Sequence, residues 1–119
     1  MSANDDSPPA RKPRPSYEPT SCVVVCRDGP QGAGARAAQT AAHLAYIETV
    51  LDELAVAGPL FDATGRITVG SLYVLRTRSL ERAREIIEND PFHKGGAFAS
   101  VEYFPHLPAA GQYIGGTIW

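Results

Sequence analysis

The order of strand-like and helix-like segments is the feature that most limits what this chain can fold into. Residues 22–26 are a short, wholly apolar run of Cys and Val, and its length and β-branching predict a buried strand. Apolar side chains then recur at helical spacing over residues 36–57, which predicts a long helix with one apolar stripe. Gly58 and Pro59 follow directly, and we expect this pair to end the helix.

The second half of the chain repeats this alternation with shorter segments. A turn at residues 65–66 predicts a hairpin between residues 59–62 and 67–76. Ser79 is a suitable N-cap for a second helix, which runs to Asn89 because the proline two residues later cannot be accommodated in it. Two further strands are predicted, in residues 97–104 and 112–118.

The main elements therefore follow the order strand, helix, strand, strand, helix, strand. This is the split βαβ pattern of ferredoxin-like α+β folds, in which a βαββαβ chain forms an antiparallel sheet with both helices on one face. Residues 67–76 are largely apolar on both faces of their strand. The face without helices would leave a large apolar patch in water. We therefore expect a homodimer in which two sheets pack face to face.

Composition and charge exclude several classes of partner. The 119 residues are 44% hydrophobic and carry a net charge of -2, which argues against a nucleic-acid or anionic-membrane binder. No stretch approaches the roughly 20 apolar residues of a membrane span. Because the N-terminus has no apolar signal-peptide core, we expect a cytoplasmic protein. Cys22 and Cys26 would lie about 13 Å apart on one strand, which is too far for a disulfide.

The chain divides into three parts on composition. Residues 1–20 hold five of the ten prolines and are expected to be a disordered tail. Residues 21–107 form the folded domain, and residues 108–119 are a C-terminal extension whose end would add a short edge strand to the sheet.

Two polar residues fall on the apolar side of the first predicted helix. His43 lies within the apolar stripe, and Arg36 lies seven residues earlier on nearly the same line. Both side chains therefore aim toward the sheet, where a charge needs a partner. One interpretation is a core histidine with an arginine at a frayed helix start. The other is a cleft in which His43 acts as a general acid or base, for which its ordinary pKa near 6.5 is suitable.

Asp90 is placed at the end of the second predicted helix, where its charge would meet the negative end of the helix dipole. An ordinary Asp-Pro turn explains it, since Pro91 follows. The functional interpretation is that Asp90 faces inward to meet a cation or a substrate proton.

Two other motifs are rejected. Residues 32–37 match G-x-G-x-x-A, but their distance from the preceding strand and the short chain argue against dinucleotide binding. Asp90, His93 and His106 lack the spacing of a metal site, so no metal and no other cofactor is predicted.

Several residues, taken in order, resemble the YCII-related (YciI-like) family across residues 21–107. They are Arg36, His43-Leu44, Gly58-Pro59, Gly70-Ser71 and Asp90-Pro91-Phe92. The resemblance implies a ferredoxin-like domain that dimerises through its sheets as a dimeric α+β barrel. It also implies that His43 and Asp90 form a catalytic pair in a cleft. One branch of the family resembles dehydrochlorinases that act on chlorinated hydroxyquinols.

From these positions we predict a cofactor-independent enzyme that moves a proton on a small cyclic or aromatic metabolite, by elimination, isomerisation or lactone-type chemistry. Arg36 would hold an anionic group and Ser71 would supply a hydroxyl. The walls around an aromatic ligand would be Tyr73, Phe92 and Phe104. The alternative is a non-catalytic dimeric ligand-binding or accessory module. A monooxygenase without haem or flavin is a third option that no residue favours.

Overall fold

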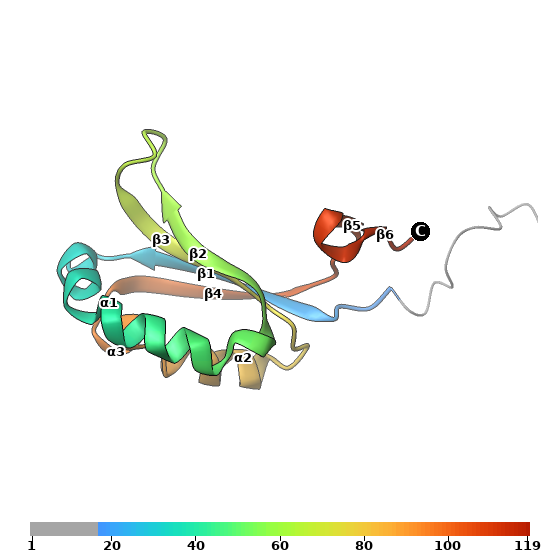
Figure 1. Ribbon diagram of the computed structural model, residues 1–119, viewed down its shortest axis with the longest axis horizontal. Helices are drawn as coiled ribbons and strands as arrows, with labels where there is room; N and C mark the ends of the chain where they lie inside the picture. Colours follow the sequence, from blue (N-terminus) through green and yellow to red (C-terminus); the bar gives the residue numbers. More distant parts are fainter. Residues whose placement is uncertain (1–16) are drawn as a thin grey trace, which may run out of the picture.

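The computed structural model describes residues 17–119, so residues 1–16 of the predicted tail lie outside the described residues. Its centre is an antiparallel sheet in the order β2-β3-β1-β4. The strands are β1 (Ser21–Asp28), β2 (Leu54–Phe61), β3 (Thr68–Leu75) and β4 (Phe98–His106). The helices are α1 (Gly32–Thr49), α2 (Leu80–Glu88) and the short α3 (Pro91–Lys94). All three helices lie on one face of the sheet (Figure 1).

This arrangement confirms the predicted α+β fold with its βαββαβ order. β1 pairs with both β3 and β4, so the first and last segments of the domain are neighbours in the sheet. The core lies between the sheet and the helices. It is built from alternate residues of the central strands, the inward face of α2 and the residue that follows α1. Its buried members are Cys22, Val24, Cys26, Val50, Tyr73, Leu75, Ala83, Ile86 and Ile87.

The predicted end of the first helix is wrong. α1 ends at Thr49, a single 3-10 turn η2 (Leu51–Glu53) follows, and β2 already begins at Leu54. Gly58 and Pro59 therefore lie inside a strand instead of ending a helix. β2 is an edge strand, where a proline that lacks an N–H is tolerated on the outer side. Pairing along the whole of β3 outweighs the helical pattern of this segment.

The second helix agrees with its sequence signals. The Ser79 side chain accepts a hydrogen bond from the Arg82 N–H and caps α2. The helix ends at Glu88, and its apolar face is buried. Figure 1 shows α2 beside α1 below the sheet, a placement that brings the segment after α2 close to the middle of α1.

The opposite face of the sheet, here called the open face, carries no helix of the described residues 17–119 (Figure 1). Its apolar side chains are half-buried or exposed, and they come from all four strands: Val23, Val25, Val56, Leu72, Val74 and Phe104. The third strand is thus apolar on both sides, as predicted.

The predicted edge strand over residues 112–118 is not part of the main sheet. Instead, β5 (Ala110–Gly111) pairs with β6 (Gly116–Thr117) around a 3-10 turn, η3 (Gln112–Ile114). Gly111, Gly115 and Gly116 adopt φ values of 140°, 81° and 127°, which glycine tolerates far better than other residues. These glycines fold the segment on itself instead of extending it along β4. Among the described residues, no helix is both long and apolar enough to cross a membrane.

Candidate active site

A cleft of about 440 Å³ lies between α1 and the β2–β3 side of the sheet. α1 contributes one wall, the two strands contribute the opposite wall, and Phe92 closes one end. The lining residues are Arg36, Thr40, His43, Leu44, Ile47, Ala57, Gly58, Pro59, Thr68, Ser71, Tyr73 and Phe92. Five of the seven predicted site residues are therefore in the lining, Asp90 is buried, and Phe104 is not part of the lining.

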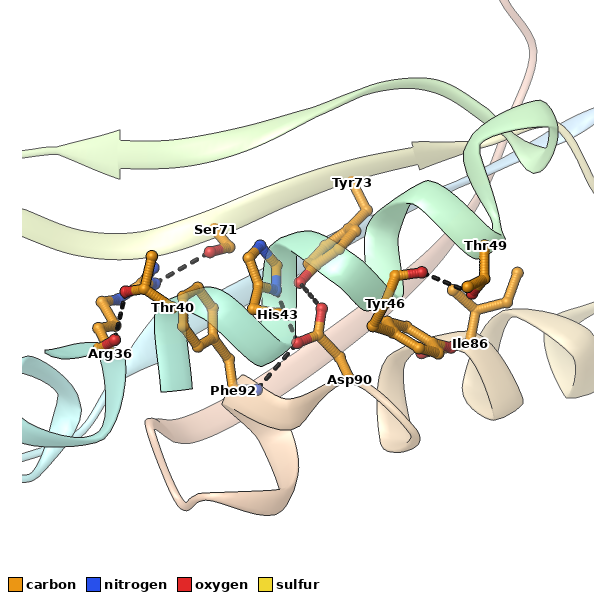
Figure 2. Close-up of polar contacts among 10 residues, drawn as sticks. All are labelled: Arg36, Thr40, His43, Tyr46, Thr49, Ser71, Tyr73, Ile86, Asp90 and Phe92. Atoms are coloured by element: carbon orange, nitrogen blue, oxygen red, sulfur yellow. Dashed lines mark hydrogen bonds and ion pairs between the residues drawn. The ribbon is translucent and has the colours of Figure 1, made fainter. Parts of the chain in front are cut away.

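His43 and Asp90 form a direct pair, although they are 47 residues apart in the chain. The Nδ1 atom of His43 lies 2.8 Å from the Oδ1 atom of Asp90. The Asp90 side chain is fully buried, whereas that of His43 keeps 15% of its exposure and faces the cleft. A bond from the Tyr46 hydroxyl to the Ile86 carbonyl, 2.7 Å long, ties α1 to α2 nearby and so holds the pair in register (Figure 2).

Asp90 does not oppose the dipole of α2 as predicted, because it starts a new helix. It is the N-cap of α3, and its Oδ1 accepts a hydrogen bond of 2.9 Å from the Phe92 N–H. Pro91 at the first helical position is pre-organised for this role. The negative carboxylate therefore sits at the favourable end of a short helix. The sequence contained a signal for this helix start, because an aspartate followed by a proline is also typical of an N-cap residue and the first residue of a helix.

Tyr73 completes the network on the other carboxylate oxygen. Its hydroxyl donates to Asp90 Oδ2 over 2.7 Å from β3 (Figure 2). Burial first, and then the charge of Asp90, raises the pKa of Tyr73, so the phenol keeps its proton and remains a donor. Tyr73 therefore hydrogen-bonds to Asp90, in addition to lining the cleft as predicted.

These contacts determine which nitrogen of His43 carries the proton. A carboxylate only accepts hydrogen bonds, so neutral His43 must bear its proton on Nδ1. Nε2 then carries a lone pair, and it lies on the side of the ring away from Asp90 (Figure 2). Within residues 17–119, Nε2 has no hydrogen-bond partner. The arrangement presents one basic nitrogen on a side chain that lines the cleft.

Arg36 has a partner that the sequence analysis missed. Its Nε and Nη2 atoms donate to the two oxygens of Asp28, at the end of β1, over 2.8 and 2.9 Å. Both side chains are largely buried, at 13% and 10% exposure. A charge at this position was expected to need a partner, but Asp28 was not identified as that partner, and it lies two residues beyond the predicted first strand. Because β1 extends to Asp28, this carboxylate is placed beside the start of α1.

Ser71 receives its hydrogen bond from the same guanidinium. Arg36 Nη2 donates to Ser71 Oγ over 2.9 Å. Among the described residues, the Ser71 hydroxyl proton has no acceptor, so the hydroxyl can still donate within the cleft.

The Phe92 ring packs mainly against polar residues of the site, instead of forming the free aromatic wall predicted from the sequence. Its ring stacks on His43 with centroids 3.8 Å apart and 9° between the planes. The Arg36 guanidinium carbon lies 4.9 Å from the same ring, and Figure 2 shows Phe92 between the two side chains. Phe104 was predicted to line the site, but it lies opposite Val23, on the open face. That prediction is wrong because one position along a strand reverses the face.

An irregularity in β3 changes which residues reach the cleft. Gly70 pairs with Leu60 but Thr68 pairs with Phe61, so Val69 is an extra residue in the ladder. The simple alternation predicted for this strand therefore fails here, and Thr68 joins Ser71 in the cleft lining. Gly70 is required at this bulge, because a Cβ atom would overlap the Cys26 carbonyl oxygen. A glycine inside a strand pattern is the signal that could have predicted it.

The thiols are not reactive groups of this site. Cys22 and Cys26 are both free and buried. Burial raises the pKa of Cys26 to about 12, and the charge of Asp90 adds to this effect. Residues 17–119 contain no group of three His, Cys, Asp or Glu side chains arranged to hold a metal ion.

A model of the YCII-related domain matches residues 20–106 of the chain. The chain belongs to the YCII-related domain family. Among solved structures, this YCII-related chain is similar to 5-chloro-2-hydroxyhydroquinone dehydrochlorinase from Burkholderia phenoliruptrix AC1100, in complex with 2,5-dihydroxybenzoquinone. The two are 28% identical with a TM-score of 0.66, and the match covers 78% of this chain and 97% of the dehydrochlorinase chain. No curated protein matches the chain.

Proposed function

We propose that this YCII-related protein is an enzyme that moves protons on a small cyclic or aromatic metabolite. The observation that carries the proposal is the His43–Asp90 pair, whose imidazole lines the cleft while the carboxylate is fully buried behind it. A base oriented by a buried acid is the arrangement that general acid–base catalysis requires. The similarity to a dehydrochlorinase supports this class of chemistry.

In the proposed reaction His43 Nε2 removes a proton from the substrate. In an isomerisation the imidazolium returns this proton to another atom of the same molecule, whereas in an elimination it releases the proton to solvent after the leaving group has departed with its electron pair. Asp90 holds the imidazole in the required tautomer and stabilises the imidazolium as it forms. Tyr73 keeps the carboxylate in place by donating to its second oxygen. Elimination and isomerisation both begin with this proton transfer, and in a lactone-type reaction His43 would instead take the proton of the attacking water or hydroxyl group as the ring C–O bond breaks. None of the three changes the oxidation state of the system, so none needs a redox cofactor.

Substrate binding is assigned to Ser71 on β3 and to apolar residues from both walls of the cleft. The charge of Arg36 is already balanced by Asp28, so the guanidinium orients Ser71 instead of forming the main contact with an anion. The Ser71 hydroxyl would donate to a substrate oxygen. Apolar walls from Ile47 and Pro59 fit a flat ring.

We also propose that the protein is a homodimer through its open face. Apolar side chains from all four strands lie on this face, and no helix in the described part of the chain covers it (Figure 1). Burying such a face against a second copy is the simplest way to remove it from water.

The test compares wild type with His43→Gln and with His106→Gln as a matched control. His106 bonds to Ser21 and is absent from the cleft lining, so its replacement should leave the chemistry unchanged. Binding of 2,5-dihydroxybenzoquinone is measured by calorimetry. Turnover is measured by chloride release from 5-chloro-2-hydroxyhydroquinone, followed by chlorinated phenols, small lactones and keto acids with assays for their own products.

We expect His43→Gln to lower kcat/KM by about 10²- to 10⁴-fold on any substrate that wild type converts, with His106→Gln equal to wild type. Equal turnover by His43→Gln and wild type would refute the role of His43. Binding without turnover across the panel would favour the non-catalytic ligand-binding module.

A further inference from the structure

The C-terminal arm, defined as residues 107–119, is chemically unlike the rest of the chain. It contains no charged side chain, and its large apolar residues are Leu107, Tyr113, Ile114, Ile118 and Trp119. Three of these are exposed, with Tyr113 at 92%, Trp119 at 58% and Ile114 at 40%. An uncharged segment with this much bare apolar surface is typical of a contact surface.

The arm is folded, yet it is not packed on its own domain. β5 and β6 pair with each other, and Ile118 N–H donates to the Ala109 carbonyl over 3.0 Å. Within the described chain, the hydrogen bonds of residues 109–119 all remain inside the arm. The arm therefore has a fixed shape while its apolar side chains find few partners in the same molecule.

The direction in which the arm leaves the sheet is also determined. Thr20 N–H donates to the His106 carbonyl, and Ser21 Oγ bonds to His106 Nδ1 over 2.8 Å, so β4 is held to its final residue. Pro105 and Pro108 stiffen the backbone around this exit. Figure 1 shows the arm beyond the end of the sheet, on the side away from the helices.

The other end of the sheet projects to the same side. The β2–β3 hairpin rises above the open face in Figure 1, and its Phe61 and Ile67 are 50% and 60% exposed. The apolar open face lies between this hairpin and the arm. A protein bound to the open face would therefore lie between the β2–β3 hairpin and the arm, which project from opposite ends of the sheet.

We propose that the arm packs against a second copy of this chain seated on the open face, and that it strengthens the homodimer. This inference rests on the dimer of the proposed function. The occupant is a second copy because the open face is itself apolar and a face-to-face pair places each copy beside the arm of the other. Folding the arm back over its own sheet would require a reversal at His106, where the chain is held. The YCII-related match ends at residue 106, so the arm is an addition of this chain to the family domain.

The sequence provides a probe, because Trp119 is the single tryptophan. The full chain is examined by sedimentation velocity over a dilution series, with Trp119 emission and acrylamide quenching at each concentration. The comparison variant is Leu72→Asp, which places a charge in the open face and should separate the two copies. Far-UV circular dichroism verifies its fold, and dilution of wild type to the monomer replaces it if it does not fold.

We expect wild-type dimer to shield Trp119 from acrylamide and the monomer to expose it. The double variant Tyr113→Ser/Trp119→Ser should raise the dimer Kd by about tenfold or more, since buried aromatic anchors dominate such contacts. A monomeric wild type, or a Leu72→Asp chain that stays dimeric, would overturn both the sheet dimer and the arm's role.

The remaining outcomes overturn the arm's role alone. In one, wild type is a dimer and Trp119 is equally exposed in dimer and monomer, or the double variant leaves Kd unchanged. In the other, Trp119 is equally shielded in both states, which would place the arm on its own chain. None of these readouts depends on a substrate, so they are independent of the proposed acid–base chemistry.

Discussion

Asp28 and Asp90 are two carboxylates beneath the same cleft, and each holds a basic side chain of α1. Asp28 binds Arg36 through two hydrogen bonds, and the guanidinium is always charged. Asp90 binds His43 through one nitrogen only and receives two further donors, from Tyr73 and from the Phe92 backbone. Within residues 17–119, the second couple therefore leaves the Nε2 atom of His43 without a partner, whereas the first uses its guanidinium to hold Asp28 and Ser71.

This difference distinguishes an ion pair that holds the cleft wall in place from the pair that is proposed to transfer a proton. A guanidinium does not lose its proton in a protein, so Arg36 cannot act as a base and instead holds Asp28 and Ser71 in the cleft wall. A neutral imidazole has one nitrogen that can accept a proton, so the Asp90–His43 couple is the one that can carry a proton. In the proposed mechanism, two similarly buried carboxylates therefore have different roles, because one is paired with an arginine and the other with a histidine.

The largest effect is expected from Asp90→Asn. The amide can donate to Nδ1, which would favour the tautomer with the proton on Nε2 and remove the basic nitrogen from the cleft. We expect kcat/KM to fall by up to about 10⁴-fold. Long-range ¹H–¹⁵N spectra of the histidines measure the tautomer directly. Tyr73→Phe is the matched control, because it removes one donor to Asp90 and leaves the charge. An unchanged tautomer in Asp90→Asn would contradict this comparison.

Asp28→Asn should reduce stability more than it affects proton transfer. It leaves the largely buried charge of Arg36 without a counter-ion, which costs about 3–5 kcal/mol in the free energy of unfolding. The double variant Asp28→Asn/Arg36→Met should recover part of this loss, because no unpaired charge then remains. Urea denaturation measures both. If the single and double variants were equally unstable, the ion pair would not be the cause.

Glu53 and Arg82 provide an exposed counterpart to the Asp28–Arg36 couple and should show the smallest effect. They also share two hydrogen bonds, of 2.9 and 2.6 Å, but their side chains are 32% and 41% exposed. We expect Glu53→Gln to cost only about 0.2–1 kcal/mol at neutral pH.

This small cost should also depend on pH with a definite sign. The hydrogen bond from Arg82 lowers the pKa of Glu53 below its ordinary value of 4.5. The pair therefore stabilises the fold above pH 4.5, and this stabilisation is lost as the pH falls through the lowered value. Unfolding curves of wild type and Glu53→Gln should converge in acid. A difference that persisted below this range would exclude the charge as its origin.

Local signals were sufficient for most of the sheet and for α2. The apolar run of β1 and the cap at Ser79 both act over a few residues, and both elements formed as predicted. The end of α1 was mistaken because residues 50–57 are good helix formers, yet strand pairing with β3 is worth more to them. The free energy of this pairing depends on β3, which follows later in the chain and lies beside residues 54–61 only after folding.

The candidate site divides in the same way. His43 and Arg36 were placed toward the sheet by their position in the helical repeat, and both line the cleft. Asp28 was missed, and Phe104 was assigned to the wrong face, because neither depends on helical spacing.

By itself, the sequence determined which residues are apolar, where α2 begins and that α1 turns a histidine and an arginine inward, since these follow from side-chain periodicity and capping. Only the tertiary structure decided that Asp90 meets His43 across 47 residues and that Asp28 meets Arg36. These pairs form because α1 and α3 pack on the same face of the sheet, close to the end of β1, and this packing removes water. Each buried charge or hydrogen-bond donor there then needs a partner within the protein.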